Sequence, residues 1–136
     1  MERECLNILL RGTQPIIIAT PSPRSRILGN WKDAIRQQRL AIITPAETAR
    51  RTTTVLAERR NHLVAHLATA LFVPYASPGG KTEALALLTI ASGKPVVALV
   101  DPANGTLVAA RATAVAAPDL AGVVARRFAN FSPKDP

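Results

Sequence analysis

The chain has 136 residues, and its 17 basic against 9 acidic side chains give a formal net charge of +8. A composition of 48% hydrophobic and 19% charged residues excludes a disordered chain and predicts one domain over residues 1–130, followed by a flexible tail over 131–136. No apolar run approaches the roughly 20 residues of a membrane-spanning helix, and no secretory signal is visible. We therefore expect a cytoplasmic protein with no membrane partner. Cys5, the only cysteine, excludes an intrachain disulfide.

The predicted elements alternate between helices and strands. The chain opens on an amphipathic helix over residues 1–11, closed by Gly12. Four short runs rich in Ile and Val predict buried strands, at residues 15–20, 40–44, 71–75 and 95–100. Helices are predicted between and after them, at residues 30–39, 54–68, 81–92 and 119–130. This order predicts an α/β fold: a Rossmann-like, doubly wound parallel sheet of four or five strands. Because no strand precedes the first helix, the fold looks N-terminally truncated.

The loops after the predicted strands nominate a binding site, since ligands of open parallel sheets lie beyond the carboxyl ends of the strands. Arginines follow the first two strands, at Arg24, Arg26, Arg50 and Arg51. The third strand is followed by Ser77, Pro78, Gly79, Gly80, Lys81 and Thr82. Glycines let a backbone approach a ligand, and amides at a helix start attract anions. Phosphate is the expected occupant; a tight turn without a ligand is the alternative.

The chain carries 13 arginines, which suit phosphate and favour a polyanionic partner such as nucleic acid. A solvated basic surface is the competing interpretation of the charge. With five aromatic side chains in all, a base-stacking platform is not expected. We therefore expect arginines and backbone amides to bind the nucleic acid.

Enzyme and metal motifs are weak. A P-loop would need a glycine where Tyr75 stands. His62 and His66 share helical spacing, but no third ligand joins them, so we expect no metal site. Glu83 and Asp101 are the best-placed acids, and we interpret Glu83 as an ordinary acid at a helix start. We therefore expect a binding protein with no catalytic residues and no cofactor.

Four segments, taken in order, resemble a known family. They are the helix of residues 57–65 (AERRNHLVA), the strand of 70–73 (ALFV), the turn of 78–83 (PGGKTE) and the strand of 92–96 (SGKPV). This succession resembles the Rossmann-like domain of the DprA/Smf DNA-processing proteins and covers about the last two-thirds of that domain, residues 14–100. The family's first strand and glycine-rich turn have no counterpart.

The resemblance implies single-stranded DNA binding in DNA recombination or natural transformation, with a RecA-type recombinase as a possible partner. It carries the family's Arg-Asn pair onto Arg60 and Asn61, and the neighbouring turn onto Gly79, Gly80, Lys81 and Thr82. We also expect a homodimer, because an incomplete sheet leaves an edge uncovered. The alternative function is a nucleotide-binding sensor or a hydrolase like the LOG phosphoribohydrolases, whose P-G-G-x-G-T-x-x-E motif the chain begins at Pro78 but does not complete.

Overall fold

The computed structural model describes residues 2–23, 29–46, 53–120 and 122–123. The chain divides into two compact units, Met1–Val64 and Ala65–Pro136. Each unit has its own parallel sheet and its own hydrophobic core. Among the described helices, none is long and apolar enough to cross a membrane.

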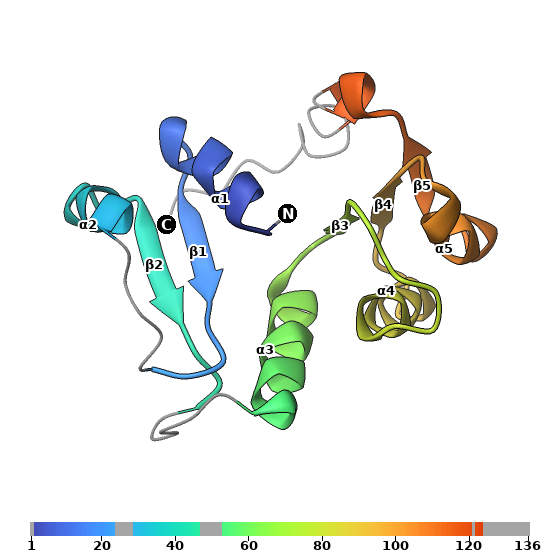
Figure 1. Cartoon of the computed structure of the whole chain (residues 1–136), viewed down its shortest axis with the longest axis horizontal. Coiled ribbons are helices and arrows are strands. Elements are labelled where there is room, and N and C mark those ends of the chain that lie inside the picture. Colours follow the sequence, from blue (N-terminus) through green and yellow to red (C-terminus); the bar gives the residue numbers. More distant parts are fainter. Residues whose placement is uncertain (1, 24–28, 47–52, 121, 124–136) are drawn as a thin grey trace. The chain divides into compact units, whose positions relative to one another are not determined.

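The first unit pairs two strands and packs helices against them (Figure 1). Its elements are α1 (Glu2–Arg11), β1 (Ile16–Ala19), α2 (Gly29–Arg36) and β2 (Leu40–Ile43), and α3 (Thr54–Leu67) runs from this unit into the next. β1 and β2 are parallel, with Ile16 opposite Leu40. These two residues form the core with Trp31 and Ala34, which lie one turn apart on α2.

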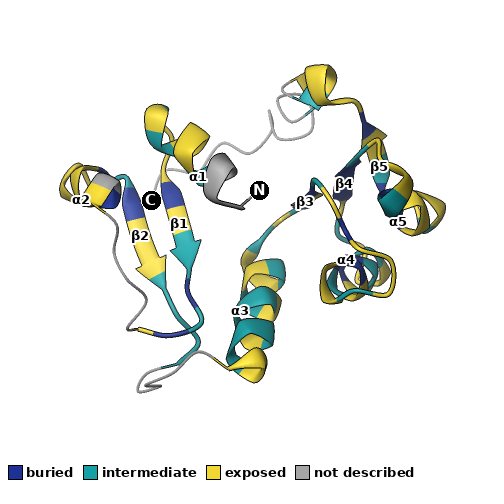
Figure 2. Cartoon of the chain, in the orientation of Figure 1, coloured by how far each residue is buried: buried dark blue, intermediate teal, exposed yellow. Residues whose placement is uncertain are grey.

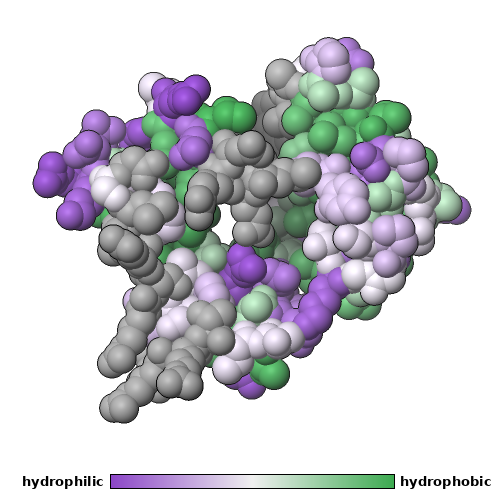
Figure 3. Space-filling model, viewed as in Figure 1, coloured by the Kyte–Doolittle hydropathy of each residue, from purple (hydrophilic) through white to green (hydrophobic). Residues whose placement is uncertain are grey.

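The outer surfaces of this unit differ in character. Lys32 and Arg36 lie exposed on α2, which forms the hydrophilic left side of Figure 3. Ile17, whose side chain alternates with the core residue Ile16 along β1, is 66% exposed. The sheet is therefore buried at Ile16 and Leu40, whereas Ile17 on the opposite face is an exposed apolar side chain.

The second unit is a three-stranded parallel sheet in the order β3-β4-β5. Its elements are β3 (Leu71–Val73), α4 (Lys81–Ala91), β4 (Val96–Leu99), the 3₁₀ turn η1 (Pro102–Asn104), α5 (Gly105–Ala109), β5 (Thr113–Val115) and the 3₁₀ turn η2 (Ala117–Asp119). The central strand β4 is the most buried one, as its dark colour in Figure 2 shows. Val96 and Ala98 pack with Val73, Ala86 and Leu107, so strands and helices share one core.

Three helices end in the same backbone motif. After α4, Gly93 takes a positive φ of 79°, its N–H donates to Ile90 O, and the Lys94 N–H donates to Thr89 O. This is a Schellman ending, which satisfies carbonyls that the helix leaves without partners. α2 and α5 end in the same way at Gln38 and Arg111, both of which hold a positive φ without being glycine.

The structure confirms the four predicted strands and the first four predicted helices to within three residues at their ends. It also confirms a mixed α/β chain with parallel strands. The strands form two sheets rather than the single one expected, because the hydrogen-bonded pairs join strands of the same unit. Most of the helix predicted at 119–130, and the predicted tail, lie outside the described residues. The prediction of a single domain over 1–130 stays a prediction.

Candidate nucleic-acid interface

The turn between β3 and α4 is the best-defined part of the predicted site. Gly79 has a φ of +70°, a conformation that favours glycine. The Gly80 N–H donates to Ser77 O at 2.9 Å, and a Cβ at Gly80 would lie 2.8 Å from that oxygen. Both glycines are therefore required by the backbone. Ser77, Gly79, Lys81 and Thr82 are exposed and Gly80 is half-buried, so the turn faces solvent.

The start of α4 offers hydrogen-bond donors. Gly80 is the N-cap residue and supplies no side chain to cap the helix. The amides of the first turn therefore lack the oxygen that Ser, Thr, Asp or Asn would provide at that position. Their partial positive charge suits an anion, and the first residue of the helix, Lys81, is exposed.

Glu83 is tied to this turn from the first turn of α4. Its Oε1 accepts a hydrogen bond of 3.0 Å from the Gly79 N–H, and the residue is only 8% exposed. This resembles a capping box, in which the third helical residue reaches back to the residues before the helix. The position at a helix start is as predicted. Its burial is not what an ordinary surface acid would show.

A second polar residue, Asn104, organises the ends of β3 and β4. Its side chain has no exposed surface; Oδ1 accepts from the Ala76 N–H at 2.9 Å, and Nδ2 donates to Pro74 O and Leu99 O. Three segments are thereby joined at one amide. The preceding Asp101 caps η1 by accepting from the Ala103 N–H at 2.8 Å. The loop that sequence nominated for ligand binding thus uses two of its polar side chains to hold the backbone.

Arg60 and Asn61 lie on α3, and both are half-buried. They belong to the first unit, whereas the glycine turn belongs to the second, so the two parts of the predicted site are placed separately. Arg24, Arg26, Arg50 and Arg51 lie outside the described residues. His62 and His66 are exposed on α3, and no group of three potential metal ligands occurs in the described part of the chain.

Lys94, in the SGKPV segment, has a structural task. Its Nζ donates to the carbonyl oxygens of Ala65, His66 and Ala68 at 2.7 to 3.0 Å. These carbonyls lie at and just beyond the end of α3, where a cation is favourable. The lysine therefore fixes a helix end rather than offering its charge to a ligand.

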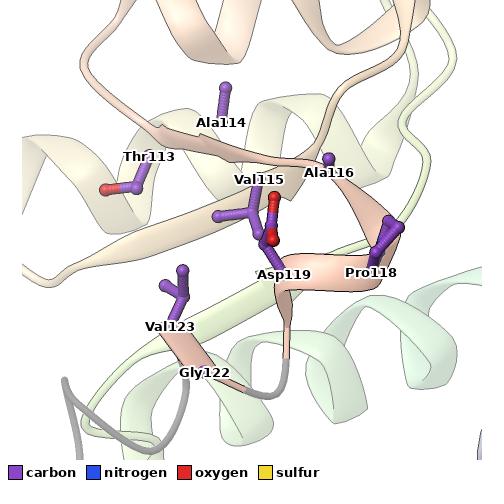
Figure 4. A pocket seen from close by; sticks show the side chains of 8 residues that line it. All are labelled: Thr113, Ala114, Val115, Ala116, Pro118, Asp119, Gly122 and Val123. Carbon is purple, nitrogen blue, oxygen red and sulfur yellow. The ribbon is translucent and has the colours of Figure 1, made fainter.

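An open pocket of about 430 Å³ lies along β5 and η2, and its described lining includes none of the residues that sequence nominated (Figure 4). Thr113, Val115, Pro118, Asp119 and Val123 line it, together with three small residues, Ala114, Ala116 and Gly122. Thr113 and Asp119 are the two polar side chains among these eight residues, and backbone groups supply further polar surface. The carboxylate of Asp119 would repel a phosphate.

Near the β3–α4 turn, two residues that hold the backbone were not among the site residues predicted from the sequence. Asn104 holds the ends of β3 and β4, and Glu83 holds the turn at Gly79. Asp101-Pro102 indicates the start of a turn that contains Asn104. The sequence does not indicate that the Asn104 side chain is buried, because asparagine is mostly an exposed residue.

Comparisons with protein-family models, with curated proteins and with solved structures find no match for this chain.

Proposed function

We propose that this chain binds single-stranded DNA through its phosphates, without base-specific readout, as the DprA/Smf-like segments imply. The observation that carries the proposal is the β3–α4 turn, where a glycine N-cap leaves helix-start amides uncapped beside an exposed lysine. The net charge of +8 supports a polyanionic ligand. Processing or recombination of DNA, with a RecA-type recombinase as a possible partner, is the cellular role that follows.

In this proposal the chain has a Rossmann-like, doubly wound fold with a basic crevice. Arg24, Arg26, Arg50 and Arg51 contact phosphates, while Arg60 and Asn61 form the floor. Residues 79–82 supply the amides that receive one phosphate. A second copy of the chain would complete a homodimer.

The test is fluorescence anisotropy with a labelled dT oligonucleotide and a matching duplex over a series of salt concentrations. We expect tighter binding to the single strand and an affinity that falls steeply as salt rises. Arg60→Ala with Lys81→Ala removes two cations and should lower the salt slope by about 2. Lys32→Ala with Arg36→Ala is the matched control, because both residues are exposed on α2 and outside the proposed site.

Equal loss in both double variants would show that only net charge matters and would reject the site. Absence of oligonucleotide binding at low salt would reject the DNA function. Binding of a mononucleotide in its place would favour the alternative of a nucleotide sensor or hydrolase.

A further inference from the structure

β5 is an edge strand of the second unit's sheet, since β4 is its only neighbour among the strands that the structure describes. The Val100 N–H donates to Val115 O at 3.0 Å, so the backbone of Val115 faces β4. Backbone groups alternate between the two sides along a strand, which directs the N–H and C=O of Ala114 away from β4. The outer side of β5 therefore carries a donor and an acceptor that a further strand can use.

This outer side also has room for a further strand. Ala114 and Ala116 are exposed, and their small side chains let another backbone approach closely. The pocket of about 430 Å³ lies along the same strand, and its described lining includes β5 and the residue after it (Figure 4). Charged side chains often protect a sheet edge from pairing, but the β5 sequence Thr113–Val115 contains none. The edge is therefore suited to strand addition.

The two ends of this strand carry opposite charges. Arg111 precedes β5, Asp119 follows it in η2, and both residues are exposed. Two copies of such a strand that pair antiparallel bring unlike charges together at both ends. A parallel pairing would set like charges side by side, which is unfavourable. The charge pattern therefore favours a second copy of this chain, in antiparallel orientation, as the occupant of the edge.

We propose that β5 is the dimerisation surface of this chain and pairs antiparallel with β5 of a second copy, so that the two sheets continue into one. The inference rests on the homodimer of the proposed function. The two-fold axis passes Ala114, which exchanges N–H and C=O hydrogen bonds with the same residue of the second copy. In this register Arg111 lies opposite Ala117 of the second copy, two residues before Asp119, within reach of a long side chain.

The charges at the ends of the strand decide how much dimer forms. β5 has three residues, so the paired strands bury little surface and the dimer is weak. Two-fold symmetry makes each contact between Arg111 and Asp119 occur twice, so one substitution changes two contacts. Reversing either charge therefore has a larger effect than it would at a single surface ion pair.

Sedimentation equilibrium over a range of protein concentrations measures the dissociation constant of the dimer. Asp119→Arg and Arg111→Asp each set like charges together twice, and we expect each to raise this constant about 10-fold. The double variant exchanges the two charges and should recover most of the lost affinity. Asp33→Arg is the matched control, because it makes the same change in net charge as Asp119→Arg at an exposed acid on α2. Circular dichroism checks that each variant folds.

A cysteine at position 114 tests the register. Across a hydrogen-bonded antiparallel pair the Cα atoms lie about 5.5 Å apart, which a disulfide can span. In a chain whose Cys5 is replaced by serine, Ala114→Cys should form a disulfide-linked dimer under mild oxidation, seen by non-reducing gel electrophoresis. Ala91→Cys in the same background is the control, because Ala91 is an exposed alanine at the end of α4 and should cross-link far less.

The outcomes separate this surface from the homodimer itself. A wild-type chain that is monomeric at every concentration overturns both, whereas oligonucleotide binding tests the DNA function independently. If a dimer forms and neither charge reversal weakens it more than Asp33→Arg does, the homodimer stands and the β5 surface is wrong. A double variant that recovers no affinity, or equal cross-linking at positions 114 and 91, rejects the antiparallel register. Should a charge variant not fold, the cross-linking comparison decides.

Discussion

Asn104 joins the ends of two strands from a fully buried position in the second unit. Its three hydrogen bonds reach Ala76, Pro74 and Leu99, at the ends of two strands, and it has no exposed surface. Groups that lose such a partner inside the protein remain without solvent to replace it. One side chain therefore fixes the position from which the glycine turn departs.

We expect Asn104→Ala to lower the free energy of unfolding by about 3 kcal/mol, because it leaves one buried and two part-buried backbone groups without their partner. Urea unfolding followed by circular dichroism measures this. Asn61→Ala is the control; this residue is half-buried on α3, and its replacement should change the stability by only about 0.5 kcal/mol. A loss below about 1 kcal/mol for Asn104→Ala would show that the three hydrogen bonds of Asn104 contribute little to stability.

The ends of the helices could be predicted from the sequence only in part. The stop of α4 was predictable because Gly93 supplies the positive φ that a Schellman ending needs. Gln38 and Arg111 adopt the same conformation at the ends of α2 and α5, and nothing in those residue types announces it. Tertiary packing on either side of the turn overrides the preference of the single residue.

Replacing Gln38 by glycine should stabilise the chain by about 1 kcal/mol, because an L side chain is strained at a φ of 58°. Arg111→Gly, at a φ of 78°, should act in the same direction. Gln37→Gly is the neighbouring control and should not stabilise, since Gln37 does not have a positive φ. Thermal denaturation ranks the three variants. A loss of stability in Gln38→Gly would mean that contacts of the glutamine side chain outweigh the backbone strain.

The strands were predictable to different degrees for physical reasons. β1, β2 and β4 are runs of branched apolar residues, which is the composition of a buried strand. β5 was not assigned from the sequence, because its three residues Thr113–Val115 contain a single branched apolar residue, Val115, and show no strong pattern. For the site, the sequence located the turn at Gly79 and Gly80. It did not reveal that Glu83 is buried, because burial depends on the packing around α4.

The division into two units raises the question of whether the whole chain unfolds in one cooperative transition. Each has its own core, yet a unit of about 60 residues buries a smaller share of its surface than a larger domain and is marginal alone. The sequence prediction of one domain therefore corresponds to one unfolding transition. Self-association likewise stays a prediction. Light scattering tests it, because a homodimer would have twice the molar mass of the single chain.

The single tryptophan makes the cooperativity measurable. Trp31 is buried in the core of the first unit, so its fluorescence reports on that unit, whereas circular dichroism reports on both. We expect the two urea transitions to have the same midpoint. Separate midpoints would show two independently folding domains and would contradict the single-domain prediction.

The buried amide of Asn104 also governs how the protein ages. An asparagine followed by glycine loses ammonia when the next backbone nitrogen attacks its side-chain carbonyl, and here the next residue is Gly105. In the folded chain the Gly105 N–H donates to Pro102 O, and the amide of Asn104 is held by its three partners. Deamidation therefore proceeds from the open state. Its product places a carboxylate against the oxygens of Pro74 and Leu99, and this repulsion opposes refolding. Each opening of this region therefore exposes Asn104 to an irreversible reaction.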